Sequence, residues 1–98
     1  MPVSKTDLFT QKELKISTIG RALAHPARIR IFELINEYGF VKNSELSIQL
    51  NLTKTSVSNH IKKLKEADLI TIDYKPNYFE ISLKQHSLKS IISFAESF

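Results

Sequence analysis

The sequence predicts a single, mainly α-helical domain that carries one small β-hairpin. Apolar residues recur at helical spacing over residues 9–67 and again over 85–98, and they alternate with polar residues over 70–83. With 98 residues, the chain is also too short to bury two separate cores. We therefore expect residues 9–98 to form four helices, a hairpin and a last helix (α-α-α-α-β-β-α), preceded by a flexible leader at residues 1–8.

Composition and charge narrow the classes of function. The formal net charge is +4, which suits a polyanionic partner but is modest. The absence of cysteine excludes disulfides, thiolate metal ligands and a cysteine nucleophile. No apolar run approaches the roughly 20 residues that cross a bilayer, and the N-terminus lacks the pattern of a signal peptide. We therefore expect a cytoplasmic protein with no membrane association.

The first two helices are predicted at residues 9–23 and 27–38. His25 and Pro26 lie between them, and a proline at the first helical position ends one helix and opens the next. We expect His25 to close this junction. Gly39 follows the second helix, where a left-handed cap favours glycine.

The third and fourth helices are predicted at residues 44–50 and 54–67. Asn43 or Ser44 is expected to cap the third helix, and Thr53 the fourth. Only three residues join them, and two short helices joined this tightly cross steeply, as in a helix-turn-helix.

A hairpin follows the helix pair directly. Strands are expected at residues 70–74 and 78–83, with a turn at Lys75-Pro76-Asn77; we call this hairpin the wing. A helix-turn-helix followed by such a hairpin is a winged helix-turn-helix, which is the predicted fold.

The outer side of the fourth helix gives the strongest indication of function. Residues 51–65 contain four basic residues and no acidic one. Short polar side chains near a helix start approach base edges, and lysines farther along meet phosphates. A solvated surface with simple caps has a similar composition, so the order of the elements, more than this face alone, favours nucleic-acid binding. The outward side chains are Lys54, Thr55, Ser56, Ser58, Asn59, Lys62, Lys63 and Lys65.

Four segments resemble the ArsR/SmtB-type repressors. Residues 22–31 resemble the opening of that family, and residues 45–53 its D-L-A-x-x-L-G-L-S segment. Residues 55–64 resemble its recognition helix, S-x-V-S-H-H-L-x-x-L, and residues 66–70 its E-A-G-L-V segment. The similarity runs in continuous register over residues 16–83. It implies a winged-helix homodimer that represses transcription, with the first and last helices forming the dimer contact.

The resemblance also implies which residues contact DNA. The expected base contacts are Lys54, Thr55, Ser58 and Asn59. The hypothesis of a DNA-binding regulator, and not the resemblance itself, adds the expected phosphate contacts Lys42, Thr53, Ser56, Lys62, Lys63 and Lys75. Asn59 stands where histidine is common in the family, so the base preference is expected to differ. Because Lys75 lies between Asp73 and Glu80, DNA contact by the wing stays open.

The metal sites implied by the resemblance are both missing from the sequence. Lys42 and Ser44 occupy the two cysteine positions of the family's E-L-C-x-C-D-L segment, and an ammonium cannot replace a thiolate. On the last helix, Gln85 and Ser87 occupy the D-x-H positions, and His86 is one residue out of register. We expect no metal and no cofactor, and the sequence identifies no effector.

The three histidines and the other polar residues do not predict catalysis. No pair among His25, His60 and His86 has metal-ligand spacing. His60 is either a phosphate contact or a solvated residue, and His86 a surface or dimer-proximal one. Without a glycine-rich phosphate loop or an arranged Ser/His/carboxylate set, we do not expect an enzyme.

The terminal helices contain more apolar positions than one protomer needs, because the middle helices and the wing already supply a core. One explanation is that these positions pack inside the protomer. The other, which the resemblance favours, is burial against a second copy, giving recognition helices about 34–36 Å apart on an inverted-repeat operator. The dimer contacts expected on that basis are Phe9, Ile16, Ile19, Leu88, Ile91, Ile92, Phe94 and Phe98.

Two functions therefore remain as hypotheses. The first is a dimeric, sequence-specific regulator of transcription that binds double-stranded DNA and represses by occluding its operator. The second is a winged helix that serves as a protein-interaction module without a DNA target, since a fold alone does not determine function. The acid-free face of the fourth helix favours the first hypothesis, while the weak wing and the modest charge favour the second.

Overall fold

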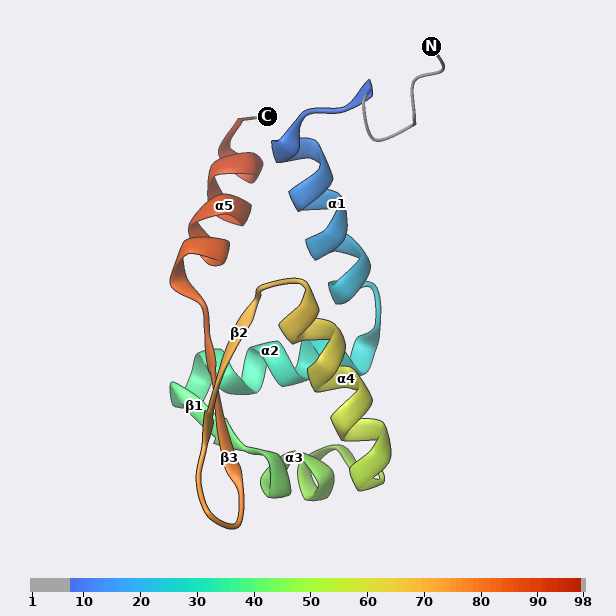
Figure 1. Cartoon of the computed structure of the whole chain (residues 1–98), viewed down its shortest axis with the longest axis vertical. Helices are drawn as coiled ribbons and strands as arrows, with labels where there is room; N and C mark the ends of the chain where they lie inside the picture. The colour runs from blue at the N-terminus through green and yellow to red at the C-terminus, as the bar shows by residue number, and fades with distance from the viewer. Residues whose placement is uncertain (1–7, 98) are drawn as a thin grey trace.

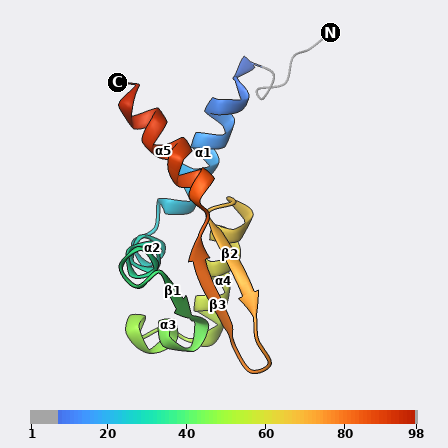
Figure 2. The same ribbon diagram turned by 90° about the vertical axis from the view of Figure 1, so that its left-hand side faces the viewer.

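Figure 1 shows a computed structural model of the chain, which describes residues 8–97. Its element order confirms the predicted fold class. α1 and α5 carry the two ends of the described chain and project on the same side of a body made of the other elements (Figure 1, Figure 2). The elements are α1 (Gln11–Leu23), α2 (Pro26–Tyr38), β1 (Phe40–Lys42), α3 (Asn43–Leu50), α4 (Lys54–Glu66), β2 (Ile70–Tyr74), β3 (Phe79–Leu83) and α5 (Gln85–Glu96).

The start of α1 is fixed by a reciprocal cap. The Glu13 N–H donates to Thr10 Oγ1 at 3.1 Å, and the Thr10 N–H donates to Glu13 Oε1 at 2.8 Å. Such a capping box satisfies two N–H groups that a helix start leaves unpaired. The helix therefore begins at Gln11, and the prediction that it begins at Phe9 is wrong. Of the predicted leader, only Leu8 lies among the described residues, and it is exposed.

The junction between α1 and α2 has the predicted form. Pro26 is the first residue of α2, and His25 caps the helix by accepting the Ala27 N–H on its Nδ1 at 3.2 Å. At the other end, Gly39 has a φ of 83°, a conformation that residues with a Cβ rarely adopt. The predicted closure by His25 is confirmed, and Gly39 has the positive φ that favours glycine, although its ψ of −39° lies outside the left-handed helical region.

The sheet has a third strand that the sequence did not predict. β1 pairs antiparallel with β3, which also pairs antiparallel with β2, giving the order β1-β3-β2. Val41, Ile81 and Ile72 form one row across the three strands. β1 has only three residues, too few for an alternating pattern, and its partner strand lies about 40 residues farther along the chain.

The start of α3 differs from the prediction. Lys42 occupies the N-cap position, and no side chain caps the helix there. Asn43 Oδ1 instead accepts the Phe79 N–H at 2.9 Å, which ties the beginning of α3 to the first residue of β3. The prediction that Asn43 or Ser44 caps α3 is therefore wrong, because the amide of Asn43 is used across the fold.

The turn between α3 and α4 is short and well bonded. Asn51 adopts a left-handed conformation, with a φ of 52°, at the end of α3. The Ser47 hydroxyl donates to the Leu52 carbonyl at 2.7 Å, and Thr53 Oγ1 accepts the Ser56 N–H at 3.1 Å. The predicted cap by Thr53 is confirmed, and the two helices form the expected helix-turn-helix (Figure 1).

The core lies where α1, α2, α3 and α4 meet the sheet. From α4 it takes the three predicted inner positions, Val57, Ile61 and Leu64. Ile19, one of the predicted dimer contacts, is only 3% exposed within the protomer and so offers little surface to a partner. No helix within residues 8–97 has the length and apolar character needed to cross a membrane. The buried apolar residues are Ile19, Ala22, Ile31, Ile35, Val41, Leu46, Val57, Ile61, Leu64, Ala67, Leu69, Ile70 and Ile81.

Candidate nucleic-acid interface

The outer face of α4 is polar, exposed and free of carboxylates until the last residue of the helix. Val57, Ile61 and Leu64 are buried and recur at i, i+4 and i+7, so they fix which face points outward. Neither Lys54 nor Lys62 forms an ion pair within residues 8–97. The structure brings together on this exposed face the four predicted base contacts and two of the predicted phosphate contacts: Lys54, Thr55, Ser58, Asn59, Lys62 and Lys63.

Thr53 and Ser56 lie at the start of this face and differ in how exposed they are. Thr53 is exposed, and its oxygen already accepts the Ser56 N–H. Because a hydroxyl that accepts one bond keeps its own proton, Thr53 can still donate to a phosphate. Ser56 is half-buried, so it offers less surface than the sequence indicated.

His60 is a packing residue, unlike either of the two roles considered from the sequence. Arg28 Nε donates to His60 Nδ1 at 3.2 Å, and the His25 ring lies 4.5 Å away between centroids at an interplanar angle of 60°. Burial lowers the pKa of His60, and the charges of His25 and Arg28 lower it further. The ring therefore stays neutral near pH 7, with Nδ1 as an acceptor, and ties α4 to the α1–α2 junction.

The wing offers little free positive charge. Lys75 Nζ lies 3.0 Å from Asp73 Oδ2 and 3.8 Å from Glu80 Oε1, and these carboxylates raise the pKa of Lys75. Two carboxylates thus surround the single ammonium of the turn. Lys42, another predicted phosphate contact, is half-buried, with its Nζ 4.9 Å from the centroid of the Tyr78 ring. Both lysines are partly engaged within the protomer.

A hollow of about 260 Å³ lies between α3, α4 and the wing. It brings Lys54 and Ser58, both predicted base contacts, next to Ser44 and to Asn77 at the wing tip. Sequence reasoning treated Asn77 only as a turn residue. Its exposed amide lies beside the expected base contacts, and the only sequence signal was an amide at the tip of a hairpin. The hollow is lined by Asn43, Ser44, Lys54, Val57, Ser58, Ile61, Asn77 and Phe79.

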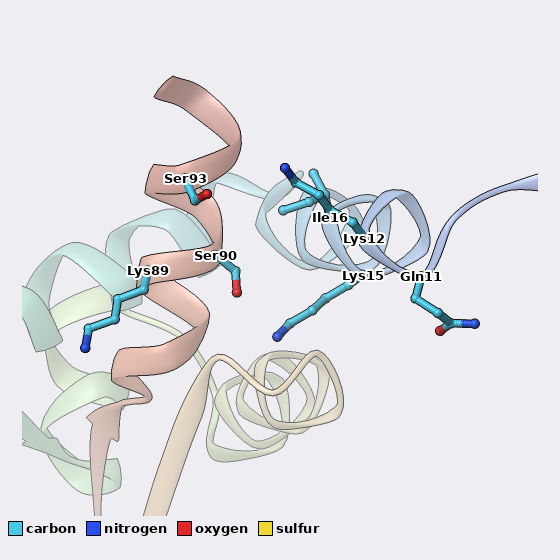
Figure 3. A pocket seen from close by; sticks show the side chains of 7 residues that line it. All are labelled: Gln11, Lys12, Lys15, Ile16, Lys89, Ser90 and Ser93. Atoms are coloured by element: carbon cyan, nitrogen blue, oxygen red, sulfur yellow. The ribbon is translucent and has the colours of Figure 1, made fainter. Parts of the chain in front are cut away.

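The surface predicted to form the dimer lies on α1 and α5. Phe9 and Ile92 are 51% and 54% exposed, whereas Ile16, Leu88, Ile91 and Phe94 are half-buried. Phe98 lies outside the described residues. A groove of about 510 Å³ separates the two helices, and Figure 3 shows Ser90 and Ser93 of α5 directed toward α1. Its lining residues are Gln11, Lys12, Lys15, Ile16, Lys89, Ser90 and Ser93.

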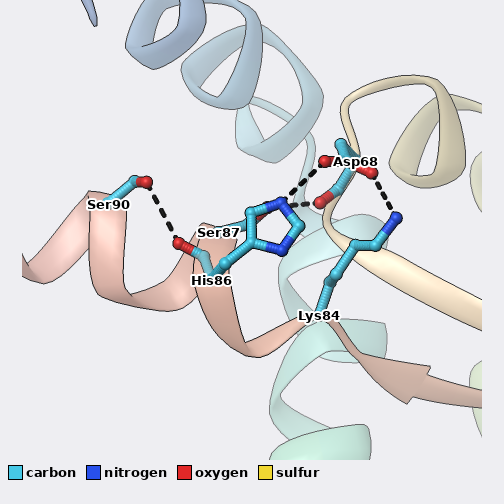
Figure 4. A network of polar contacts seen from close by, with 5 residues as sticks. All are labelled: Asp68, Lys84, His86, Ser87 and Ser90. Carbon is cyan, nitrogen blue, oxygen red and sulfur yellow. Dashed lines mark hydrogen bonds and ion pairs between the residues drawn. The ribbon is translucent and has the colours of Figure 1, made fainter.

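A polar network joins the end of α4 to the start of α5 (Figure 4). The carboxylate of Asp68 lies 2.6 Å from Lys84 Nζ and 2.9 Å from His86 Nε2, and the Ser87 hydroxyl donates to the Asp68 carbonyl. The hydrogen bonds from Lys84 and His86 lower the pKa of Asp68. Asp68 has a φ of 61°, a conformation that aspartate tolerates better than most residues. The resemblance places a glycine at this position, which the positive φ explains.

The described part of the chain holds no group of three or more histidine, aspartate or glutamate side chains that could bind a metal. His86, the histidine nearest to the family's metal position, instead faces Asp68. His25 is engaged in capping α2, and His60 in packing against Arg28.

Comparisons with known proteins agree with this geometry. A helix-turn-helix domain family matches residues 23–73. The chain is 31% identical over 77 residues to the HTH-type transcriptional regulator CmtR of Mycobacterium tuberculosis, an alignment that covers 79% of this chain but only 64% of CmtR. It is also 25% identical over 83 residues to the transcriptional repressor SdpR of Bacillus subtilis, covering 85% of this chain and 91% of SdpR.

The fold has a close counterpart among solved structures. The crystal structure of an ArsR family transcriptional regulator superimposes with a TM-score of 0.79 at 18% identity, covering 91% of both chains. The family match spans more than half of the chain and contains both helices of the motif. The chain therefore belongs to the helix-turn-helix domain family and has the winged-helix fold of ArsR-type transcriptional regulators.

Proposed function

We propose that this chain is a sequence-specific, DNA-binding regulator of transcription that acts as a dimeric repressor. The observation that carries this proposal is the outer face of α4. Its lysines and short polar side chains are exposed, and the buried positions Val57, Ile61 and Leu64 hold that face outward. A helix of this shape and charge fits the major groove of DNA.

Within this proposal, each side chain has a role that follows from its chemistry. The amide of Asn59 matches the paired donor and acceptor of adenine, and the ammonium of Lys54 matches the acceptors of guanine. Thr55 and Ser58 are short enough to approach base edges beside them. The backbone phosphates are held by Lys42, Thr53, Ser56, Lys62, Lys63 and Lys75, among which Lys75 contributes least because Asp73 and Glu80 neutralise it.

Repression follows from dimerisation in this proposal. Apolar side chains on α1 and α5 pack against a second copy, and the two-fold axis sets the two α4 helices about 34–36 Å apart. Such a dimer occupies an inverted repeat and blocks polymerase, with no metal, cofactor or enzymatic step. The relative SdpR is named as a repressor, which supports this direction of control. The proposed contacts are Phe9, Ile16, Leu88, Ile91, Ile92 and Phe94.

Fluorescence anisotropy tests the proposal against the DNA upstream of the gene and a scrambled duplex, across salt concentrations. We expect the upstream DNA to bind at least about a thousandfold more tightly, with affinity falling steeply as salt rises. Asn59→Ala should relax the preference at one base pair, at a cost of about 1–3 kcal/mol. Asn36→Ala, on the exposed side of α2, is the matched control and should change nothing. Equal loss on both duplexes in Asn59→Ala would refute its role in base reading.

A protein-interaction module without a DNA target is the second candidate function. The wing favours it, because Lys75 is surrounded by Asp73 and Glu80 and the hairpin offers no free cation to a minor groove. Equal, weak binding to both duplexes in the anisotropy experiment would make this candidate the leading one.

A further inference from the structure

A second hollow, away from the expected base contacts, lies where α1, α2 and α4 meet. Its volume is about 370 Å³, within the range of sites for small ligands. Only Lys63 among its residues belongs to the phosphate contacts proposed above. The lining residues are Thr18, Arg21, Ala22, Arg28, Lys63, Glu66 and Ala67.

The charge of this hollow is positive, and three different helices supply it. Arg21 comes from α1, Arg28 from α2 and Lys63 from α4, against the single carboxylate of Glu66. Lys63 Nζ lies 3.8 Å from Glu66 Oε2, and these side chains are 58% and 53% exposed. An exposed pair of this length is weak, so it yields readily to another anion. Two positive charges are left in excess around the hollow.

Existing hydrogen bonds hold the two arginines in place. Arg28 is half-buried and donates from Nε to His60 Nδ1 at 3.2 Å and from Nη1 to the Ala22 carbonyl at 3.3 Å. A guanidinium has five N–H groups, so three remain for a ligand. The Ala22 carbonyl oxygen, which would repel an anion, is already bonded. Arg21 Nη2 donates to Thr18 Oγ1 at 3.4 Å, which holds the Arg21 side chain against α1.

We propose that this hollow is an anion site for a phosphate group. Arginine forks match phosphate oxygens in pairs, and Lys63 adds a third donor from the opposite helix. The phosphate comes either from the DNA backbone or from a small phosphate-bearing ligand. Binding of a DNA phosphate at this site rests on the proposed function, whereas binding of a small phosphate ligand does not. An occupied site would join α1, on the proposed dimer surface, to α4, which reads the bases.

Arg21→Gln is the variant that tests this site. Arg21 is exposed, so its replacement removes one cation without opening the core. Lys12→Gln is the matched control, because it removes one charge from the same helix but lines the α1–α5 groove instead. Circular dichroism and thermal unfolding should be the same for both variants and the unchanged protein.

The first arm of the experiment uses inorganic phosphate. It is titrated at constant ionic strength against chloride, and the arginine side-chain N–H signals are followed by nuclear magnetic resonance. We expect saturable shifts at Arg21 and Arg28 in the unchanged protein and in Lys12→Gln. In Arg21→Gln the Arg28 signal should saturate at concentrations at least about tenfold higher, because one arginine fork is lost.

The second arm measures DNA affinity against salt concentration. If the site takes a backbone phosphate, Arg21→Gln should reduce the slope of log affinity against log salt by about one per protomer, and Lys12→Gln should not. A response in the first arm alone assigns the site to a small phosphate ligand, and a response in the second alone assigns it to DNA. Variants that behave alike in both arms would overturn the proposal. Absence of any DNA binding would defeat the proposed function, while the first arm would still decide this site.

Discussion

His60 makes the stability of the protein depend on pH in a defined window. Its pKa is lowered in the fold by burial first and by the charges of His25 and Arg28 second. An unfolded histidine titrates near 6.5, so the unfolded chain takes up a proton there before the folded chain does. The free energy of unfolding should therefore fall as the pH drops below about 6.5, and level off below the folded pKa. Above that window, the contribution of His60 is fully present.

The upper limit of this effect follows from the linkage between proton uptake and unfolding. Uptake of one proton by the unfolded chain alone changes the unfolding free energy by about 1.4 kcal/mol per pH unit, which is the upper limit for His60. Because the ring is only half-buried, solvent screening reduces this slope. Protonation of Nδ1 also replaces the hydrogen bond from Arg28 Nε with a contact between two donors.

Urea denaturation at pH 5.0, 6.0 and 7.0 measures the effect, with His60→Gln as the comparison. The Gln side-chain oxygen keeps an acceptor for Arg28 but does not titrate, so the pH dependence between about 5 and 6.5 should be weaker in the variant. Nuclear magnetic resonance of the His60 ring provides a second readout, a midpoint below 6.5. If the stability curves of the two proteins run parallel over this range, the assigned role of His60 is wrong.

Four further substitutions probe the core, the α4–α5 link, the wing and the outer face of α4. Leu64→Ala empties a fully buried position of α4 and should cost about 2–5 kcal/mol of unfolding free energy, measured by urea denaturation. Asp68→Asn removes the charge that pairs with Lys84. In the unchanged protein, the stability from this pair is lost as the pH falls through the lowered pKa of Asp68, so the variant should lack that stability at neutral pH and should lack this acid transition. Acid titration followed by circular dichroism checks this. Lys75→Ala should leave DNA affinity nearly unchanged in anisotropy, because Asp73 already pairs with Lys75. Lys62→Ala should weaken binding to all duplexes alike and lower the slope of log affinity against log salt by about one per protomer. A larger effect of Lys75→Ala than of Lys62→Ala would show that the ion pairs of Lys75 open on DNA.

Local patterns were enough to predict most of the fold. The buried stripe of α4, the cap by Thr53 and the hairpin of β2 and β3 involve residues only a few positions apart, and all three are confirmed. The features that the sequence missed depend on distant partners. β1 exists because Phe40–Lys42 pair with β3. Asn43 does not cap α3, because its side-chain oxygen accepts the Phe79 N–H.

For the candidate site too, the sequence predicted the local features but not the contacts between distant residues. A helical pattern identified which face of α4 is outward, and hence the exposed polar residues on it. It did not reveal that Arg28 lies against His60, 32 residues away, or that Lys75 is already paired. Ile19 shows the same limit, because a pattern on α1 marks apolar positions without telling which of them face the protomer's own core.

The position of α4 is held by polar contacts at its middle and just beyond its last residue, in addition to its buried stripe. Near its middle, His60 is bonded to Arg28, which also bonds the Ala22 carbonyl of α1. Just beyond its last residue, Asp68 is bonded to Lys84 and His86 at the start of α5. α1 and α5 are the helices proposed to form the dimer, so the reading helix is attached to both of them. In the proposed dimer, reading an inverted repeat would require a fixed distance between the two α4 helices, and these two junctions link α4 to the helices proposed to form the dimer. A change at the Asp68 junction should therefore alter operator affinity without touching a residue proposed to contact DNA.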